Sequence, residues 1–270
     1  MTTFVTSSRG DRVALDDLGS GPAVVFVAGA GPSRADDEMT ASTARLLADG
    51  GCRALVPDRL GRNESVAHGV LDLAREVAAL RAVVDHVGEP VVLVGHSSGC
   101  SLALRAVADG VRAEGLVLWE APLAGPAADT AAWAADVERH LDAGDLEAAT
   151  EQYMRDMPPE WLDGMRSSPA WPRLAAATRT QRADAQALAW ATAALEDRSL
   201  GSTVDLPVLT CFGSETFPEM PAAAARLAEV LPRATVAELP GAGHAWDPEA
   251  MAPVLARFLR EVSVPGAQSD

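Results

Sequence analysis

The stretch VVLVGHSSGC, residues 91–100, decides the fold. It joins an apolar, β-branched run to a G-x-S-x-G motif, and the sequence that follows has helical character. A strand that turns sharply into a helix needs small residues beside the turn, which Gly95 and Gly99 provide, and the turn lifts the Ser97 hydroxyl clear of the sheet. The stretch therefore predicts a nucleophilic serine at a helix N-terminus. We expect the His96 side chain to point away from that hydroxyl and to be a residue of the pocket wall or of the packing around it, and not the base.

Similar apolar runs recur on both sides of this stretch and alternate with longer helical segments. That alternation predicts an α/β fold with a mostly parallel, doubly wound sheet and helices on both faces. An opening antiparallel hairpin at residues 4–7 and 12–16 would bring the sheet to eight strands. The six expected parallel strands span residues 23–29, 52–58, 91–97, 114–120, 206–213 and 234–239.

The strand pattern stops between residues 123 and 200, where the sequence is rich in alanine and helical in period. Breaks at glycines and prolines predict four or five short helices. We therefore divide the chain into a core of residues 1–124 and 201–270 and a helical cap of residues 125–200. Four of the six tryptophans fall in this cap: Trp133, Trp161, Trp171 and Trp190.

Composition excludes several classes of protein. The 270 residues are 48% hydrophobic, which suffices for a large core, and the net charge of −16 disfavours nucleic acid and anionic membranes as partners. All 22 basic residues are arginine, so lysine-dependent chemistry such as a Schiff base, a pyridoxal site or a P-loop is excluded. The three cysteines are widely spaced, which predicts neither disulfides nor a metal site. The sequence has no long apolar run, so we expect a soluble, cytoplasmic protein. No cofactor is expected.

A serine at its ordinary pKa needs a base, and in this kind of fold the histidine follows the last strand. His244 stands there in the glycine-rich segment 239–246, LPGAGHAW, which can turn back over the serine. The oxyanion of a tetrahedral intermediate needs N–H donors, and we expect them from the backbones of Ser98 and Ala30. Gly29 and Gly31 would let the Ala30 N–H face the site.

These motifs together resemble the α/β-hydrolase-fold serine hydrolases with a helical cap, and the resemblance covers nearly the whole chain. It includes the loop GAGP at 29–32, the turn DRLGRNES at 58–65, the serine turn and the His244 loop. Ala28 stands where many relatives have a histidine, which affects loop support more than the backbone donor. A narrower similarity is to zearalenone-type lactone hydrolases, with the Ser-Ser-Gly motif, a glutamate after the sixth strand and a cap tryptophan, here Trp171.

The acid of the triad departs from the common pattern. Most relatives have an aspartate three residues after the glycine that ends the seventh strand, and here Thr216 has that position. Glu120, at the end of the sixth strand, is the favoured acid, because a buried carboxylate needs a specific partner and the resembling lactone hydrolases have their acid there. Glu215 is the alternative, and Asp58 and Asp247 are weaker ones.

The sequence therefore predicts a serine hydrolase that cleaves an ester or lactone of a small apolar molecule through an acyl-enzyme. Ser97 argues against dehalogenase or epoxide chemistry, which uses an aspartate nucleophile in this fold. The same triad could cleave a thioester or a carbon–carbon bond beside a ketone, and a non-catalytic ligand-binding protein is a further alternative. The oligomeric state, monomer or homodimer, stays open. The expected substrate contacts are Gly31, His96, Trp119 and Trp171.

Overall fold

The computed structural model describes residues 1–263, and it contains a nine-stranded sheet in the order β1-β2-β4-β3-β5-β6-β7-β8-β9. Strands β3 to β8 are parallel, whereas β1 and β2 run antiparallel at one edge and β9 antiparallel at the other. The strands are β1 (Thr3–Thr6), β2 (Arg12–Gly19), β3 (Ala23–Val27), β4 (Arg53–Pro57), β5 (Val91–His96), β6 (Ala113–Trp119), β7 (Val208–Glu215), β8 (Ala234–Ala242) and β9 (Ala245–Trp246).

The predicted α/β class, the parallel strands and the opening hairpin are confirmed. The strand count differs by one, because the two-residue β9 pairs with the end of β8. Its residues directly follow His244, in a glycine-rich loop that gives no strand signal in the sequence.

Alternate residues of each central strand enter different apolar layers. On β3, Val25 and Val27 pack in the layer that contains α2 (Leu73–Val87), α3 (Ser98–Ala108) and part of α10 (Met220–Val230). Val24 and Phe26 pack in the layer that contains α1 (Glu38–Asp49) and α11 (Pro248–Ser263). Strands buried on both faces read as continuous apolar runs, which is why they were visible in the sequence.

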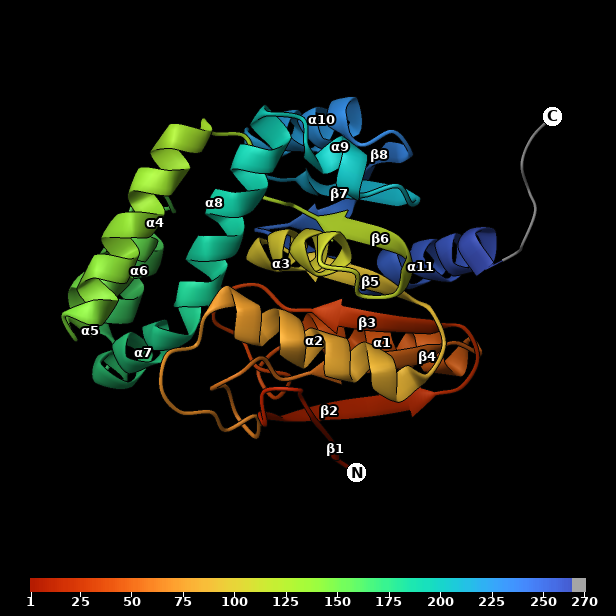
Figure 1. Ribbon diagram of the computed structural model, residues 1–270, viewed down its shortest axis with the longest axis horizontal. Helices are drawn as coiled ribbons and strands as arrows, with labels where there is room; N and C mark the ends of the chain where they lie inside the picture. Colours follow the sequence, from red (N-terminus) through yellow and green to blue (C-terminus); the bar gives the residue numbers. More distant parts are fainter. Residues whose placement is uncertain (264–270) are drawn as a thin grey trace.

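The segment between β6 and β7 is helical and lies at one end of the sheet (Figure 1). Helix α8 runs between helices α4 to α7 and the sheet with its flanking helices, and it packs against α2, α3 and α4. The expectation of short helices is right for α5 to α7 and wrong for α4 and α8, which have 16 and 15 residues. The segment comprises α4 (Ala127–Asp142), α5 (Leu146–Tyr153), α6 (Pro159–Ser167), α7 (Trp171–Ala177), a 3₁₀ turn (Thr178–Gln181), α8 (Arg182–Glu196) and α9 (Leu200–Thr203).

Candidate active site

Ser97 occupies the sharp turn between β5 and α3. Its backbone has φ 54° and ψ −127°, a conformation that a residue with a side chain rarely adopts. The flanking glycines permit the turn because a Cβ on Gly95 would lie 2.6 Å from the Cα of Cys100, and one on Gly99 would lie 2.1 Å from the Val27 carbonyl oxygen. The turn therefore places the serine at the N-terminus of α3 in a strained backbone conformation.

Glu120 follows β6 and binds the His244 ring. Its carboxylate Oε2 lies 2.5 Å from Nδ1 of His244, and Oε1 accepts bonds from the Gly213 backbone N–H at 2.9 Å and the Thr216 hydroxyl at 2.5 Å. The residue is 2% exposed and has a φ of 46°. Burial alone would raise the pKa of Glu120, but hydrogen bonds from His244, Thr216 and Gly213 hold it below its ordinary value. The carboxylate is therefore charged and fully engaged beside the imidazole.

The other acids considered from the sequence lie elsewhere. Glu215 is exposed on β7, and Asp247 is exposed and accepts a bond from the Glu249 backbone N–H. Asp58 is buried and accepts bonds from Asn63 in its own turn and from Arg34 in the segment after β3. Of the four carboxylates, Glu120 is the one in contact with His244.

The backbone of His244 is held from below by two side chains. Its φ is 75°, and its carbonyl oxygen accepts bonds from Nε2 of His96 at 2.9 Å and from the indole N–H of Trp119 at 3.1 Å. Burial and the neighbouring His244 ring lower the pKa of His96 to about 4. His96 is therefore neutral with its proton on Nε2, which agrees with the unpartnered, buried Nδ1 atom.

This arrangement corrects one of the expected substrate contacts, Trp119, and leaves the His96 contact a prediction. Trp119 is completely buried under the His244 loop, so it is not a contact for substrate. His96 uses its ring to hold the same loop, at a ring-centroid distance of 4.9 Å from His244. Both residues position the histidine.

The loop after β3 lies against Ser97. A Cβ on Gly29 would lie 3.6 Å from the Ser97 hydroxyl oxygen and 2.9 Å from the His96 carbonyl oxygen, so only glycine fits. Within residues 1–263, the N–H groups of Ala30 and Ser98 donate to no other group. Gly31, exposed and at φ 103°, turns the chain away. Both N–H groups are thus available as hydrogen-bond donors, and their role as an oxyanion hole stays a prediction.

No hydrogen bond joins the Ser97 hydroxyl to the His244 ring among the contacts of the described residues. Such bonds are often long in an enzyme without substrate and shorten in the complex. The two residues are nevertheless neighbours, because His96 precedes Ser97 and binds the His244 backbone.

Cap tryptophans differ in their relation to this site. Trp161 of α6 is 38% exposed and meets Phe217 edge to face at 5.8 Å, and Phe217 lies 5.9 Å from the His244 ring. Trp171, the expected substrate contact, is half-buried at the start of α7, and its place in substrate binding stays a prediction. Trp133 packs on Tyr153 inside the cap.

A buried ionic cluster beside Ser98 was not predicted. Asp184 of α8 contacts Arg59, Arg62 and the Ser98 hydroxyl, and Arg59 also lies 3.4 Å from Glu76. The arginines stand in the 58–65 turn that the sequence singled out, but Asp184 lies in an alanine-rich helix without any motif. Only the packing of cap on core brings it to the serine.

A match to a family model now identifies the fold family. The model described as "Alpha/beta hydrolase family" matches residues 24–257. The chain belongs to the alpha/beta hydrolase family. A search of curated proteins found no match.

Solved structures place this alpha/beta hydrolase among known relatives in fold. An alpha/beta hydrolase from Sphaerobacter thermophilus is 29% identical, with a TM-score of 0.74 over 95% of this chain and 99% of that one. An esterase from Thermogutta terrifontis is 24% identical, with a TM-score of 0.62 over 98% and 100%. An esterase from Exiguobacterium antarcticum is 17% identical, with a TM-score of 0.67 over 96% and 100%. The comparisons support the family, and the likeness to zearalenone-type lactone hydrolases stays a prediction.

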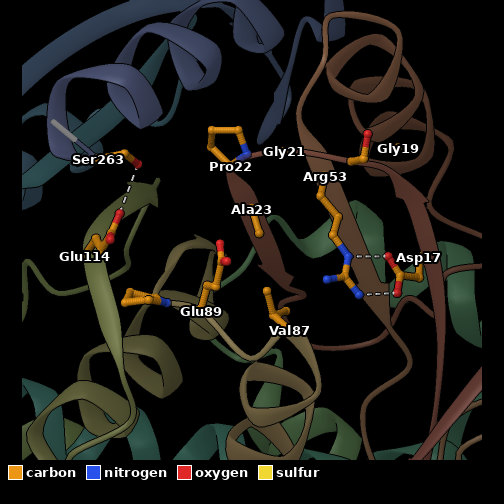
Figure 2. Close-up of a pocket in the computed structure, with 12 residues that line it drawn as sticks. Asp17, Gly19, Gly21, Pro22, Ala23, Arg53, Val87, Glu89, Glu114 and Ser263 are labelled. Atoms are coloured by element: carbon orange, nitrogen blue, oxygen red, sulfur yellow. Dashed lines mark hydrogen bonds and ion pairs between the residues drawn. The ribbon is translucent and has the colours of Figure 1, made fainter.

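A hollow of about 910 Å³ opens at the opposite end of the alpha/beta hydrolase sheet (Figure 2). It is lined where β3 and β4 begin, whereas ligands of open α/β sheets bind where parallel strands end. Its Arg53 makes two bonds of 2.8 and 2.7 Å with Asp17. That pairing lowers the pKa of Asp17 and leaves no free charge for a ligand on either side chain.

Residues 1–263 of this alpha/beta hydrolase contain neither a candidate membrane span nor a candidate metal cluster. Among them, no helix is both long and apolar enough to cross a membrane. The same residues contain no group of three or more His, Cys, Asp or Glu side chains suited to a metal ion. The three cysteines are buried and free.

Proposed function

We propose that this alpha/beta hydrolase is a serine hydrolase that cleaves a carboxylic ester or lactone of a small apolar molecule. One observation carries the proposal: a buried, charged Glu120 binds Nδ1 of His244 beside the strained Ser97 turn. A buried carboxylate on a histidine is costly unless it has a role, and here it stabilises the charged imidazole that proton transfer would create.

The reaction follows from the tautomer that Glu120 selects. The N–H group at Nδ1 of His244 donates a hydrogen bond to the Glu120 carboxylate and keeps its proton, so Nε2 is free to take the proton of the Ser97 hydroxyl. Ser97 Oγ attacks the carbonyl carbon, and His244 then gives the proton to the leaving alcohol oxygen. Water, deprotonated by the same imidazole, hydrolyses the resulting acyl ester and releases the carboxylic acid.

Charge that develops on the carbonyl oxygen is met by the free N–H groups of Ala30 and Ser98. The Ser98 donor also lies at the N-terminus of α3, whose dipole favours negative charge. Because both proposed donors are backbone N–H groups, an alanine at position 28, where many relatives have a histidine, is compatible with this oxyanion site.

The substrate class rests on the aromatic pair beside His244. Trp161 and Phe217 present an apolar wall near the catalytic base, which suits an apolar acyl or alcohol group. The lactone alternative rests on Glu120 as the acid and on Trp171 in its Pro-x-Trp setting. The same triad could cleave a thioester or a carbon–carbon bond beside a ketone, so the substrate screen must include these.

The test is labelling by a fluorophosphonate probe, followed by a substrate screen. An activated serine is phosphonylated, and we expect Ser97→Ala to abolish labelling and Ser97→Ala and His244→Ala each to lower ester turnover by about three orders of magnitude with the fold retained. The screen then compares the hydrolysis rates of p-nitrophenyl esters of increasing chain length, thioesters, and small and macrocyclic lactones. Absence of labelling in the wild type, or full labelling of the Ser97→Ala variant, would refute the proposal.

A further inference from the structure

Asp184 is a cap residue with a fully buried carboxylate at the floor of the active site. It lies in the first turn of α8 and is 1% exposed. Its Oδ1 accepts a bond of 2.7 Å from the Ser98 hydroxyl and also contacts Arg59, and its Oδ2 lies 3.3 Å from Arg62. A single side chain from the cap thus reaches the residue directly after the nucleophile.

The two arginines extend this contact to the loop on the other side of the serine. Arg62 donates to the carbonyl oxygens of Gly29, at 2.6 Å, and Pro32, at 3.2 Å, which flank Ala30 in the chain. Arg59 donates to the Ala28 carbonyl oxygen at 3.2 Å. Both guanidinium groups are almost completely buried.

We infer that Asp184 is a positioning residue that aligns both oxyanion donors, holding Ser98 directly and the Ala30 loop through Arg62 and Arg59. This inference rests on the proposed function. The Ser98 N–H is fixed when its own side chain is bonded to Asp184, and the Ala30 N–H is fixed when the carbonyl groups around it are bonded to arginines that Asp184 holds. Because an oxyanion hole works by preorganised geometry, the cap becomes part of transition-state stabilisation.

The two buried arginines of the cluster need the Asp184 carboxylate as a counter-charge. Burial and the nearby Arg59 lower the pKa of Arg62 to about 10, and the Asp184 and Glu76 carboxylates oppose that effect. The Nε atoms of both arginines have no hydrogen-bond partner, and Glu76, the other carboxylate of the cluster, contacts Arg59 but neither Arg62 nor Ser98 among the described residues. In a buried network that is only partly satisfied, removal of one charge disturbs the remaining members.

The experiment compares the rates of fluorophosphonate labelling and of p-nitrophenyl butyrate hydrolysis in Asp184→Asn, in Ser98→Ala and in the double variant. We expect Asp184→Asn to lower kcat and the labelling rate constant by about 10- to 100-fold with KM within about twofold, since a misaligned oxyanion hole affects the transition state. Ser98→Ala keeps the backbone donor and should lose about three- to tenfold. The double variant should lose less than the product of the two, because both changes break the same link.

Asp142→Asn is the matched control, because the exposed Asp142 of α4 also pairs with an arginine of α8, Arg182, but contacts neither Ser98 nor the arginines of the cluster among the described residues. Its rates should stay within twofold of wild type. A folded Asp184→Asn protein with wild-type labelling would overturn the inference while the proposed function stands, whereas an unlabelled wild type would refute the proposed function itself. If Asp184→Asn does not fold, Ser98→Ala decides: a threefold or larger loss in kcat at constant KM supports the inference, and unchanged kcat overturns it.

Discussion

Thr216 donates a hydrogen bond to the carboxylate that contacts His244. The sequence resemblance implies a triad aspartate at this position, whereas here the Thr216 hydroxyl donates to the Glu120 carboxylate at 2.5 Å. Glu120 therefore approaches the imidazole from β6, and Thr216, which follows β7, donates to its carboxylate. Gly213 leaves room for this carboxylate, because a Cβ at that position would lie only 3.2 Å from Oε1 of Glu120.

The identity of the acid is tested by amide substitution. Glu120→Gln keeps the size of the side chain but loses the charge that stabilises imidazolium, so we expect kcat to fall by roughly 10² to 10⁴. Glu215→Gln removes an exposed carboxylate and should cost less than about tenfold. Both are measured at one pH with matched folded fractions. If Glu215→Gln is the inactive variant, the acid has been assigned to the wrong strand.

The Thr216 hydroxyl predicts a shift in the pH profile. Its bond helps to hold the pKa of Glu120 below the ordinary value, so Thr216→Val should raise that pKa and move the loss of activity on the acid side to higher pH. We expect kcat at neutral pH to fall by about three- to tenfold. Thr216→Ser keeps the hydroxyl and is the control. Superimposable profiles for the valine and serine variants would contradict the prediction.

At the scale of elements, the sequence predicts what local patterns encode. The buried strands appear in the sequence as apolar runs, and the Ser97 turn consists of a strand, a glycine motif and a helix in that order. Both can therefore be located from the sequence alone. Asp184 and Thr216 could not be assigned partners, because their contacts join segments 86 and 96 residues apart. The roles of His96 and Trp119 were hidden for the same reason, since both bind a backbone carbonyl more than 120 residues away.

Helix α6 of the cap brings Trp161 to the rim of the site, which predicts an effect on selectivity. Trp161→Ala should lower kcat/KM for phenyl-substituted esters by about three- to tenfold and leave acetate esters unchanged, because an aromatic contact contributes about 0.5–1.5 kcal/mol. Stability should change little, since the side chain is already partly exposed. Trp171→Ala is compared on the same esters. If that variant shows the loss of selectivity and Trp161→Ala does not, the substrate contacts α7.

Over the whole molecule, arginine alone supplies the buried cations. Arg34, Arg59 and Arg62 are almost fully buried and bind loops where the parallel strands end. A guanidinium group can bind several acceptors at once, which a lysine ammonium does less well in a buried position. The acidic chain thus places its buried positive charge around the proposed active site, where it fixes loop geometry.

The stability of the whole protein should depend on pH through His96. Its pKa is about 4 in the folded protein and near 6.5 when unfolded, so the unfolded chain binds an extra proton between these values. The contribution of His96 to the free energy of unfolding is therefore fully present above about pH 6.5. It is lost progressively as the pH decreases toward 4. Since the ring is only half-buried, we expect this group to contribute a loss of about 1–2 kcal/mol.

His96→Gln isolates this contribution, because its amide can donate to the His244 carbonyl oxygen without titrating. Urea unfolding of the wild type and the variant at pH 7.5, 6 and 4.5 should show a smaller decrease in unfolding free energy for the glutamine protein. Carboxylates such as Glu120, which titrate at lower pH, are common to both proteins and cancel in the comparison. Parallel decreases from pH 7.5 to 4.5 would mean that His96 accepts its proton equally well when folded, and that the ring is not held neutral beneath the His244 loop.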